Sequence, residues 1–264
     1  MRLKFAGLTD VGRTRDNNED SFFISTQEPL CIVADGMGGH SSGEVASAFA
    51  IRTIREYYER TLVDPEIESR LRRKLPPWPF KRRAPDHVEE RRLVQAVMLA
   101  NEVVHGYADT REEYRGMGTT VVGAYFIETG MYLVHIGDSR AYRIRDGKME
   151  RITRDHSLAD EYLAMGILRA DELEAFPYKN VVTRALGLSD QVEPEVNFYT
   201  IQPDDMYVLC SDGLTDPLDD PTVMRIAMEH ADDLEAGCRA LIDAANEAGG
   251  PDNITVVLAR TQVV

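Results

Sequence analysis

Cysteine is scarce in this chain, and its three cysteines, Cys31, Cys210 and Cys238, stand far apart without a regular spacing. Two of them lie inside apolar runs, where cysteine behaves as a small hydrophobic residue. An odd number of unpatterned cysteines argues against a disulfide framework and favours a reducing cytoplasm. No Cys or His pair has the spacing of zinc ligands, so a zinc site is disfavoured.

Long hydrophobic runs are also missing. No window approaches the roughly 18 apolar residues of a membrane span, and residues 1–7 lack the apolar stretch of a signal peptide. Positive charge is in deficit as well, because the formal net charge is −15 over 264 residues. That charge opposes general binding to a nucleic-acid backbone. We therefore expect a cytoplasmic protein with no membrane span and no nucleic-acid partner.

The apolar residues that are present form two kinds of pattern. Three- and four-residue steps predict three helices, which cover 45–58, 93–107 and 234–245. Short apolar runs without polar alternation predict strands buried on both faces, at 30–34, 119–127, 131–136, 206–210 and 254–259. Asp146-Gly147 predicts a tight hairpin between neighbouring strands. Together these elements indicate a layered domain of helices and strands, with residues 1–264 as a single domain.

One segment differs from the rest in composition. Residues 70–92 hold nine Arg or Lys, three acids, four prolines and the single tryptophan, so their net charge is +6. The proline density predicts a loop at 64–92 between the first two helices. Two interpretations stay open: a docking surface for an acidic partner, a phosphorylated kinase segment or an anionic membrane face, and a solvated loop.

Four aspartates stand where buried strands leave the core. Asp35, Asp138 and Asp212 follow apolar strands, and Asp252 precedes one. Taken singly, each could be a turn residue bonded to its own backbone. If the four converge, they repel one another and need a counter-charge, and oxygen ligands alone select hard cations such as Mg²⁺ or Mn²⁺. The glycine after Asp35, Gly36, would let a backbone carbonyl approach such a metal.

A second polar group lies near the beginning of the chain. Arg15, Glu19 and Asp20 precede a short apolar strand at 21–24. A guanidinium offers a planar set of donors that matches a phosphate. The alternative interpretation is a solvated turn.

These residues resemble a known family, the type 2C metal-dependent serine/threonine protein phosphatases. Six motifs occur in the family order and span nearly the whole chain, at 12–20, 34–40, 118–120, 136–140, 211–213 and 252–253. The motif at 35–40 and the run at 180–187 are similar to the bacterial branch. The resemblance implies an α+β fold, a four-layer α-β-β-α sandwich of two antiparallel sheets flanked by helical pairs, with metals at one end.

The resemblance also implies a reaction. A protein serine/threonine phosphatase would hydrolyse phosphoserine and phosphothreonine esters by attack of a water that bridges two metals, with two or three Mn²⁺ or Mg²⁺ ions. Asp35 would bridge two metals beside the carbonyl of Gly36. Asp212 and Asp252 would complete one metal, and Asp138 would bind a third, weaker ion together with Asp212.

Other roles implied by the resemblance are less direct. Glu19 and Asp20 would act mainly through metal-bound water, and Arg15 would hold the substrate phosphate. Met37 stands where animal members have a histidine proposed as general acid, a feature that the bacterial branch shares. Protonation of the leaving group would then fall to metal-bound water or to His40.

Residues 156–187 match the family's flap beside the active site, with 165–166 and 176–177 as hinge or turn points. The alternative is an ordinary surface excursion. His156, in the Asp155-His156-Ser157 turn, is interpreted as a structural residue.

Two alternative functions remain at this point. One is a catalytically silent regulatory or binding module of the same fold, which the loss of a metal aspartate would mark. The other is a two-metal phosphatase acting on small phosphometabolites, which sugar phosphates tested against phosphopeptides would separate. The expected partners are phosphorylated proteins, with a serine/threonine kinase as a further candidate, and we expect a monomer.

Overall fold

Two antiparallel sheets form the centre of the structure, a computed structural model that describes residues 2–39, 42–63 and 87–262. One sheet has the strand order β1 (Arg2–Asp10), β11 (Ile254–Gln262), β10 (Met206–Cys210), β7 (Arg140–Arg145), β8 (Lys148–Arg151). The other has the order β2 (Asp20–Ile24), β3 (Leu30–Met37), β5 (Val121–Ile127), β6 (Gly130–Ile136), β9 (Glu195–Tyr199), and β4 (Gly118–Thr119) pairs with β3.

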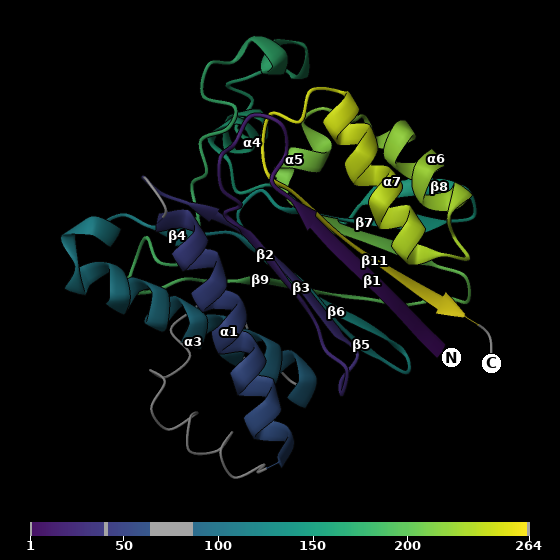
Figure 1. Cartoon of the computed structure of the whole chain (residues 1–264), viewed down its shortest axis with the longest axis horizontal. Helices are drawn as coiled ribbons and strands as arrows, with labels where there is room; N and C mark the ends of the chain where they lie inside the picture. Colours follow the sequence, from purple (N-terminus) through teal and green to yellow (C-terminus); the bar gives the residue numbers. More distant parts are fainter. Residues whose placement is uncertain (1, 40–41, 64–86, 263–264) are drawn as a thin grey trace.

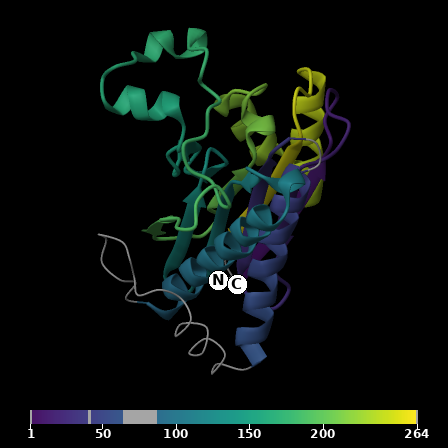
Figure 2. The same cartoon turned by 90° about the vertical axis from the view of Figure 1, so that its left-hand side faces the viewer.

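Helices cover the outer face of each sheet (Figures 1 and 2). On the β2–β9 sheet these are α1 (Ser42–Val63) and α3 (Val88–Thr110), followed by the 3₁₀ turn η1 (Glu112–Tyr114). On the other sheet they are α6 (Asp220–Glu229) and α7 (Leu234–Glu247). The layers therefore run helix, sheet, sheet, helix, which confirms the predicted four-layer α+β sandwich.

Alternate residues of each central strand face two different cores. In β3, Leu30 and Ile32 pack under α1 and α3, whereas Cys31 and Val33 pack between the two sheets. Both sets are fully buried. This double burial explains why the central strands read as unbroken apolar runs instead of alternating ones.

Several local predictions are confirmed. The three predicted helices lie within α1, α3 and α7. Asp146 and Gly147 join β7 to β8 with φ angles of 51° and 70°, the left-handed pair that a two-residue hairpin requires. All three cysteines are free and buried. None of the described helices is long and apolar enough to cross a membrane.

The predicted basic loop at 64–92 needs a correction at its end. Residues 64–86 lie outside the described residues, but α3 begins at Val88 and so includes 88–92. The last proline of the segment is Pro85, and Glu89 and Glu90 occupy the first helical turn, where the helix dipole favours acids.

Arg92, which was counted with that loop, is a core residue of α3. Its guanidinium donates to both carboxylate oxygens of Glu28 at 2.7 Å and lies 4.7 Å from the ring centre of Tyr58. The side chains of Arg92 and Glu28 are only 13% and 8% exposed. Arg92 is therefore committed to holding α3 against the β2–β3 turn.

A buried ion pair of this kind is costly to break from one side. Arg92→Met should lower the free energy of unfolding by about 3 kcal/mol, because the Glu28 carboxylate stays buried without its cation. Urea unfolding measures this change. The double variant Glu28→Leu with Arg92→Met should lose less than Arg92→Met alone, and Arg225→Met, which breaks an exposed pair with Glu229, should change little. Equal losses for Arg92→Met and Arg225→Met would contradict the buried-pair interpretation.

Candidate metal centre

Two of the predicted acids face each other across neighbouring strands. In the antiparallel register of β2 and β3, Asp20 stands directly opposite Asp35. Asp35 therefore lies inside its strand and not after its end, because β3 continues to Met37, where β4 pairs with it. Like charges at directly opposite positions destabilise a sheet, so this pairing needs a compensating charge.

Gly36, next to Asp35, is required for a reason that the sequence did not reveal. A Cβ at this position would lie 2.0 Å from the carbonyl oxygen of Gly43 and 2.6 Å from that of Glu19. Glycine is thus needed so that the first turn of α1 can pack against β3. The predicted approach of its carbonyl to a metal stays a prediction.

The remaining aspartates lie at strand ends of the β1–β8 sheet or on the connection between the two sheets. Asp212 begins α5 (Asp212–Thr215) directly after β10, Asp138 lies between β6 and β7, and Asp252 precedes β11. The charge of each acts on Asp35, as does that of Asp20. The structure therefore places within electrostatic range of Asp35 the acids that the sequence had placed at separate strand ends.

Burial and mutual repulsion perturb these acids strongly. Burial first, and then the neighbouring aspartates, raise the pKa of Asp35 well above its ordinary value. The same causes, with Asp138 as the strongest neighbour, raise the pKa of Asp212. Burial raises the pKa of Asp20 to about 6, and burial with the charge of Asp155 raises the pKa of Asp138 to about 6. A nearby cation would reverse all four shifts.

One atom of the cluster shows a specific need for such a cation. Ser211 donates a hydrogen bond of 2.7 Å to Oδ2 of Asp20. The other oxygen of Asp20, Oδ1, is buried and meets no donor in the described part of the chain. Hard divalent cations prefer carboxylate oxygens as ligands. This oxygen of Asp20 has no hydrogen-bond donor among the described residues and lies among carboxylates that repel it, so a cation would stabilise it. The residues present therefore fit Mn²⁺ or Mg²⁺.

The N-terminal polar group adjoins this cluster. Nη2 of Arg15 lies 2.7 Å from Oδ2 of Asp252, and the Arg15 side chain is 47% exposed. Burial raises the pKa of Glu19, and its backbone N–H donates to Oδ1 of Asn253 at 2.8 Å. The structure thus places Arg15 at the open side of the acid cluster and Glu19 beside it.

Sequence reasoning missed two residues that organise the site. The amide of Asn253 also donates to the carbonyl oxygens of Val11 and Asn17 at 2.9 Å, so it ties the N-terminal segment to β11. The negative charge of Asp216, which directly follows α5, also raises the pKa of Asp212. The only signals were the position of Asn253 beside Asp252 and the four-residue spacing of Asp216 from Asp212.

The predicted alternative acid, His40, lies outside the described residues.

The flap prediction at 156–187 covers α4 (Leu158–Ala164) and the 3₁₀ helix η2 (Ala170–Ala175). These two short helices project beyond the sheets at the end of the sandwich where α5 lies (Figures 1 and 2). The segment 156–187 is therefore at the same end as α5, and its role as a flap stays a prediction.

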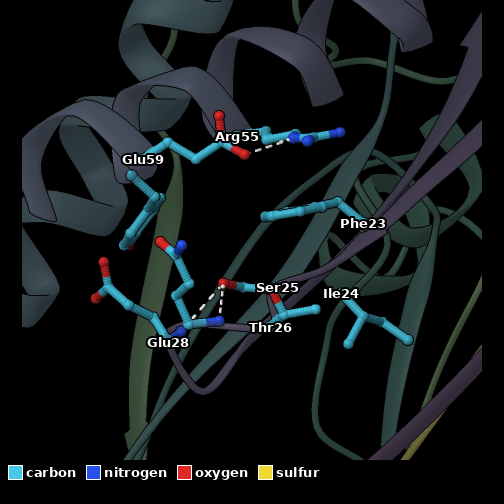
Figure 3. Close-up of a pocket in the computed structure, with 9 residues that line it drawn as sticks. Phe23, Ile24, Ser25, Thr26, Glu28, Arg55 and Glu59 are labelled. Atoms are coloured by element: carbon cyan, nitrogen blue, oxygen red, sulfur yellow. Dashed lines mark hydrogen bonds and ion pairs between the residues drawn. The ribbon is translucent and has the colours of Figure 1, made fainter.

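A separate pocket of about 250 Å³ lies between the β2–β3 turn and α1 (Figure 3). Three of its polar side chains already have partners, since Arg55 pairs with Glu59 at 2.7 Å and Ser25 Oγ accepts from two backbone N–H groups. Ser25 follows Ile24, which is four residues or about 13 Å along β2 from Asp20. This pocket does not belong to the acid cluster.

Comparison with known proteins identifies the family. Residues 12–248 match the family model described as Protein phosphatase 2C. The serine/threonine phosphatase stp of Listeria welshimeri is 34% identical over 262 residues, which cover 97% of this chain and 95% of that protein. The Mycobacterium tuberculosis serine/threonine phosphatase PstP/Ppp has a crystal structure that is similar with a TM-score of 0.82 at 32% identity, covering 99% of both chains.

A second solved structure carries metals. The catalytic domain of the serine/threonine protein phosphatase PstP in complex with two manganese ions is similar with a TM-score of 0.80 at 31% identity, covering 99% of both chains. The present chain therefore belongs to the protein phosphatase 2C family. It is a bacterial-type serine/threonine protein phosphatase that hydrolyses phosphoesters of phosphorylated proteins with Mn²⁺ or Mg²⁺. The predicted function, enzyme class and cofactors are confirmed.

The pKa of Asp138 gives a pH dependence with a definite sign. In the metal-free protein it is about 6 in the folded state, against 3.8 as the ordinary value. The folded state holds this proton more tightly, so the stabilisation is present below pH 4 and is lost as the pH rises through 6. The free energy of unfolding of the wild type should fall between pH 5 and pH 7.5. On the order of 1 kcal/mol of that fall should be absent from the Asp138→Asn variant.

Urea unfolding in EDTA at the two pH values measures this difference. Asp109→Asn, an exposed aspartate at the end of α3, should show the wild-type pH dependence. With Mn²⁺ the dependence should reverse, since cations compete with protons for the carboxylates. An Asp138→Asn protein with the same pH dependence as wild type would show that Asp138 does not carry this proton.

Proposed function

We propose that Asp35, Asp212 and Asp252 hold the catalytic cations of this phosphatase, with Asp35 shared between two of them. The observation that carries the proposal is the acid cluster around the buried, unpartnered Asp20 oxygen. Asp35 is partly buried and feels the charge of four other aspartates. A central carboxylate of this kind is suited to bridging, whereas Asp252, at the open side, is suited to a single ion.

A bridged pair of divalent cations, when bound, activates a water as nucleophile and neutralises the phosphate oxygens. The chain's own residues then have separate tasks. Glu19 and Asp20 would accept hydrogen bonds from water at the site and so orient it. Gly36 would contribute its backbone carbonyl as a ligand, and Asp138 with Asp212 would hold a further, weaker ion.

Arg15 is proposed to bind the substrate phosphate. Its guanidinium is half-exposed and is anchored by one nitrogen to Asp252. A guanidinium has five N–H donors, so the others remain free to donate to phosphate oxygens next to the cations. The pair with Asp252 therefore pre-orients Arg15 towards the site where the phosphoester binds.

The flap is proposed to contact the protein part of the substrate. Three of its large apolar side chains, Met165, Ile167 and Tyr178, are between 58% and 68% exposed. The segment that carries them projects at the end of the sandwich where α5 lies (Figures 1 and 2). Exposed apolar side chains beside an active site suit a polypeptide chain better than a small polar phosphometabolite.

The remaining proposals concern the setting of the reaction. We propose that the protein acts as a monomer. A phosphorylated serine/threonine kinase carries the ester that this enzyme hydrolyses and is proposed as one substrate. The three buried free cysteines suit a reducing compartment, for which we propose the cytoplasm.

The metal assignment predicts the effect of a single substitution. Asp212→Asn should lower turnover of a phosphothreonine peptide by about 10²-fold or more, because it removes a charge that fixes the cations. The fold should survive, since the variant relieves repulsion among buried acids. Wild type should lose activity in EDTA and regain it with Mn²⁺, and Asp109→Asn should keep full activity. A folded Asp212→Asn protein with the wild-type rate would refute the assignment.

A further inference from the structure

The turn that carries Asp138 is held from both sides by two consecutive residues, Asp155 and His156. Asp155 accepts from Nη2 of Arg140 at 2.7 Å, just after Asp138 in the chain. On the other side, the N–H of His156 donates to the carbonyl oxygen of Gly137 at 2.9 Å. The N–H of Gly137 donates back to Nδ1 of His156 at 3.2 Å. Asp138 therefore lies between two residues, Gly137 and Arg140, that are each held by hydrogen bonds.

Gly137 has little freedom to move in this position. Its φ angle is +105°, and a Cβ would lie 2.5 Å from Cγ2 of Thr120. The Thr120 hydroxyl in turn accepts from the backbone N–H of Asp35 at 3.0 Å and lies 2.6 Å from the hydroxyl of Ser139. The Asp138 turn is thus packed against the residue that holds the backbone of Asp35.

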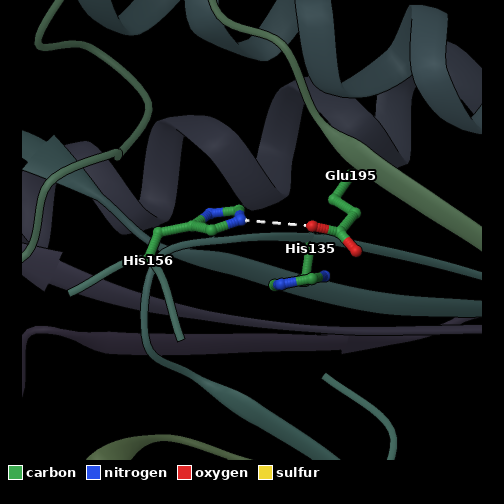
Figure 4. Close-up of side chains that lie close together, drawn as sticks. All are labelled: His135, His156 and Glu195. Atoms are coloured by element: carbon green, nitrogen blue, oxygen red, sulfur yellow. Dashed lines mark ion pairs between the residues drawn. The ribbon is translucent and has the colours of Figure 1, made fainter. Parts of the chain in front are cut away.

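His156 itself belongs to a small buried cluster with His135 and Glu195 (Figure 4). The two imidazole rings stack with centroids 4.6 Å apart. Nε2 of His156 faces Oε2 of Glu195 at 3.6 Å, which is longer than a hydrogen bond and so is an electrostatic contact. The His156 ring is the main cause that lowers the pKa of Glu195 to about 2, so the carboxylate is charged.

The hydrogen bonds of this cluster argue against a metal between its side chains. Because Gly137 N–H can only donate, His156 Nδ1 accepts, and the proton of the neutral ring is on Nε2. That nitrogen has no lone pair for a metal. The ring planes also differ by only 19°, so in-plane lone pairs of His135 and His156 cannot converge on one ion. The proton on Nε2 points instead towards Glu195.

We propose that His156 is a positioning residue: it accepts the Gly137 N–H and so fixes the Asp138 carboxylate towards Asp212 and the weaker cation. Glu195 and the stacked ring of His135 hold the imidazole in the tautomer that can accept. The proposal rests on the role of Asp138 given under the proposed function. It extends the purely structural interpretation of His156.

The backbone of His156 extends this arrangement to the flap. Its carbonyl oxygen accepts from the N–H of Thr183 at 2.8 Å, and Ser157, the next residue, caps α4 through the N–H of Asp160. His156 is therefore anchored on the flap side as well as on the Gly137 side. A change in its side chain should act on Asp138 and not on the flap backbone.

The test is equilibrium binding of Mn²⁺ to the full chain, with free Mn²⁺ measured by electron paramagnetic resonance. His156→Phe keeps a ring to stack on His135 but has no acceptor. It should raise the Kd of the weakest Mn²⁺ site about tenfold, and leave the tighter sites unchanged. His156→Asn places an amide oxygen near the position of Nδ1, and should restore most of the affinity.

A double-mutant cycle separates positioning from general destabilisation. Asp138→Asn should weaken the same site, and adding His156→Phe should weaken it no further, because there is no carboxylate left to position. If the two substitutions instead raise the Kd of this site by factors that multiply in the double variant, the proposed role of His156 would be overturned, whereas that of Asp138 would stand. An Asp138→Asn protein with an unchanged weakest site would instead overturn the proposed role of Asp138, and the inference with it.

A second pair of variants covers the case in which His156→Phe fails to fold. Glu195→Ala removes the carboxylate that faces Nε2, and should raise the weakest Kd by about threefold, a smaller effect than loss of the acceptor itself. Glu195→Gln keeps an acceptor oxygen and should bind Mn²⁺ as wild type does. Equal affinities for Glu195→Ala and wild type would overturn the proposal.

Discussion

Two carboxylates, Asp20 and Asp35, stand opposite each other on neighbouring antiparallel strands, with Asp20 buried and Asp35 partly buried. Both burial and repulsion oppose their ionisation, and the two effects reinforce each other because a low dielectric strengthens the repulsion. Only protons or cations can make the arrangement tolerable at neutral pH. The rest of the site can be understood as a way of delivering further negative charge and oxygen ligands to this pair.

The sandwich can place further acids beside this pair because its two sheets end at the same level. β2 and β3 bring one pair of acids, while the ends of β10 and β11 bring Asp212 and Asp252 from the facing sheet. Neutral groups fix the positions without adding charge, as Ser211 does for Asp20 and Thr120 does for Asp35. In metal sites generally, hydrogen bonds from the residues behind the ligands hold the ligands in position.

Most of the helices and strands could be predicted from local pattern, whereas the four-layer arrangement was implied by the family resemblance. The exceptions among the elements have physical causes. Strands buried on both faces form unbroken apolar runs, and helices α1, α3 and α7 have strong periodicity. The strands β1 and β9 were missed because they lie at sheet edges, where most residues are exposed or only partly buried. The short helix α6 was missed because Pro221, which suits a first turn, resembles a loop signal in sequence. The acids of the site were found because each adjoins a buried strand, but the register that opposes Asp20 and Asp35 depends on long-range pairing. The Gly137–His156 contact depends on the same kind of pairing.

The most direct measurement of the central claim is anomalous diffraction at the manganese edge from crystals of this protein grown with Mn²⁺. The account predicts at least two strong peaks within coordination distance of carboxylate oxygens of Asp35, with Asp212 and Asp252 bound to one of the two ions. Peaks confined to other acidic surfaces, or an Asp35 carboxylate without any ion at saturating Mn²⁺, would contradict it.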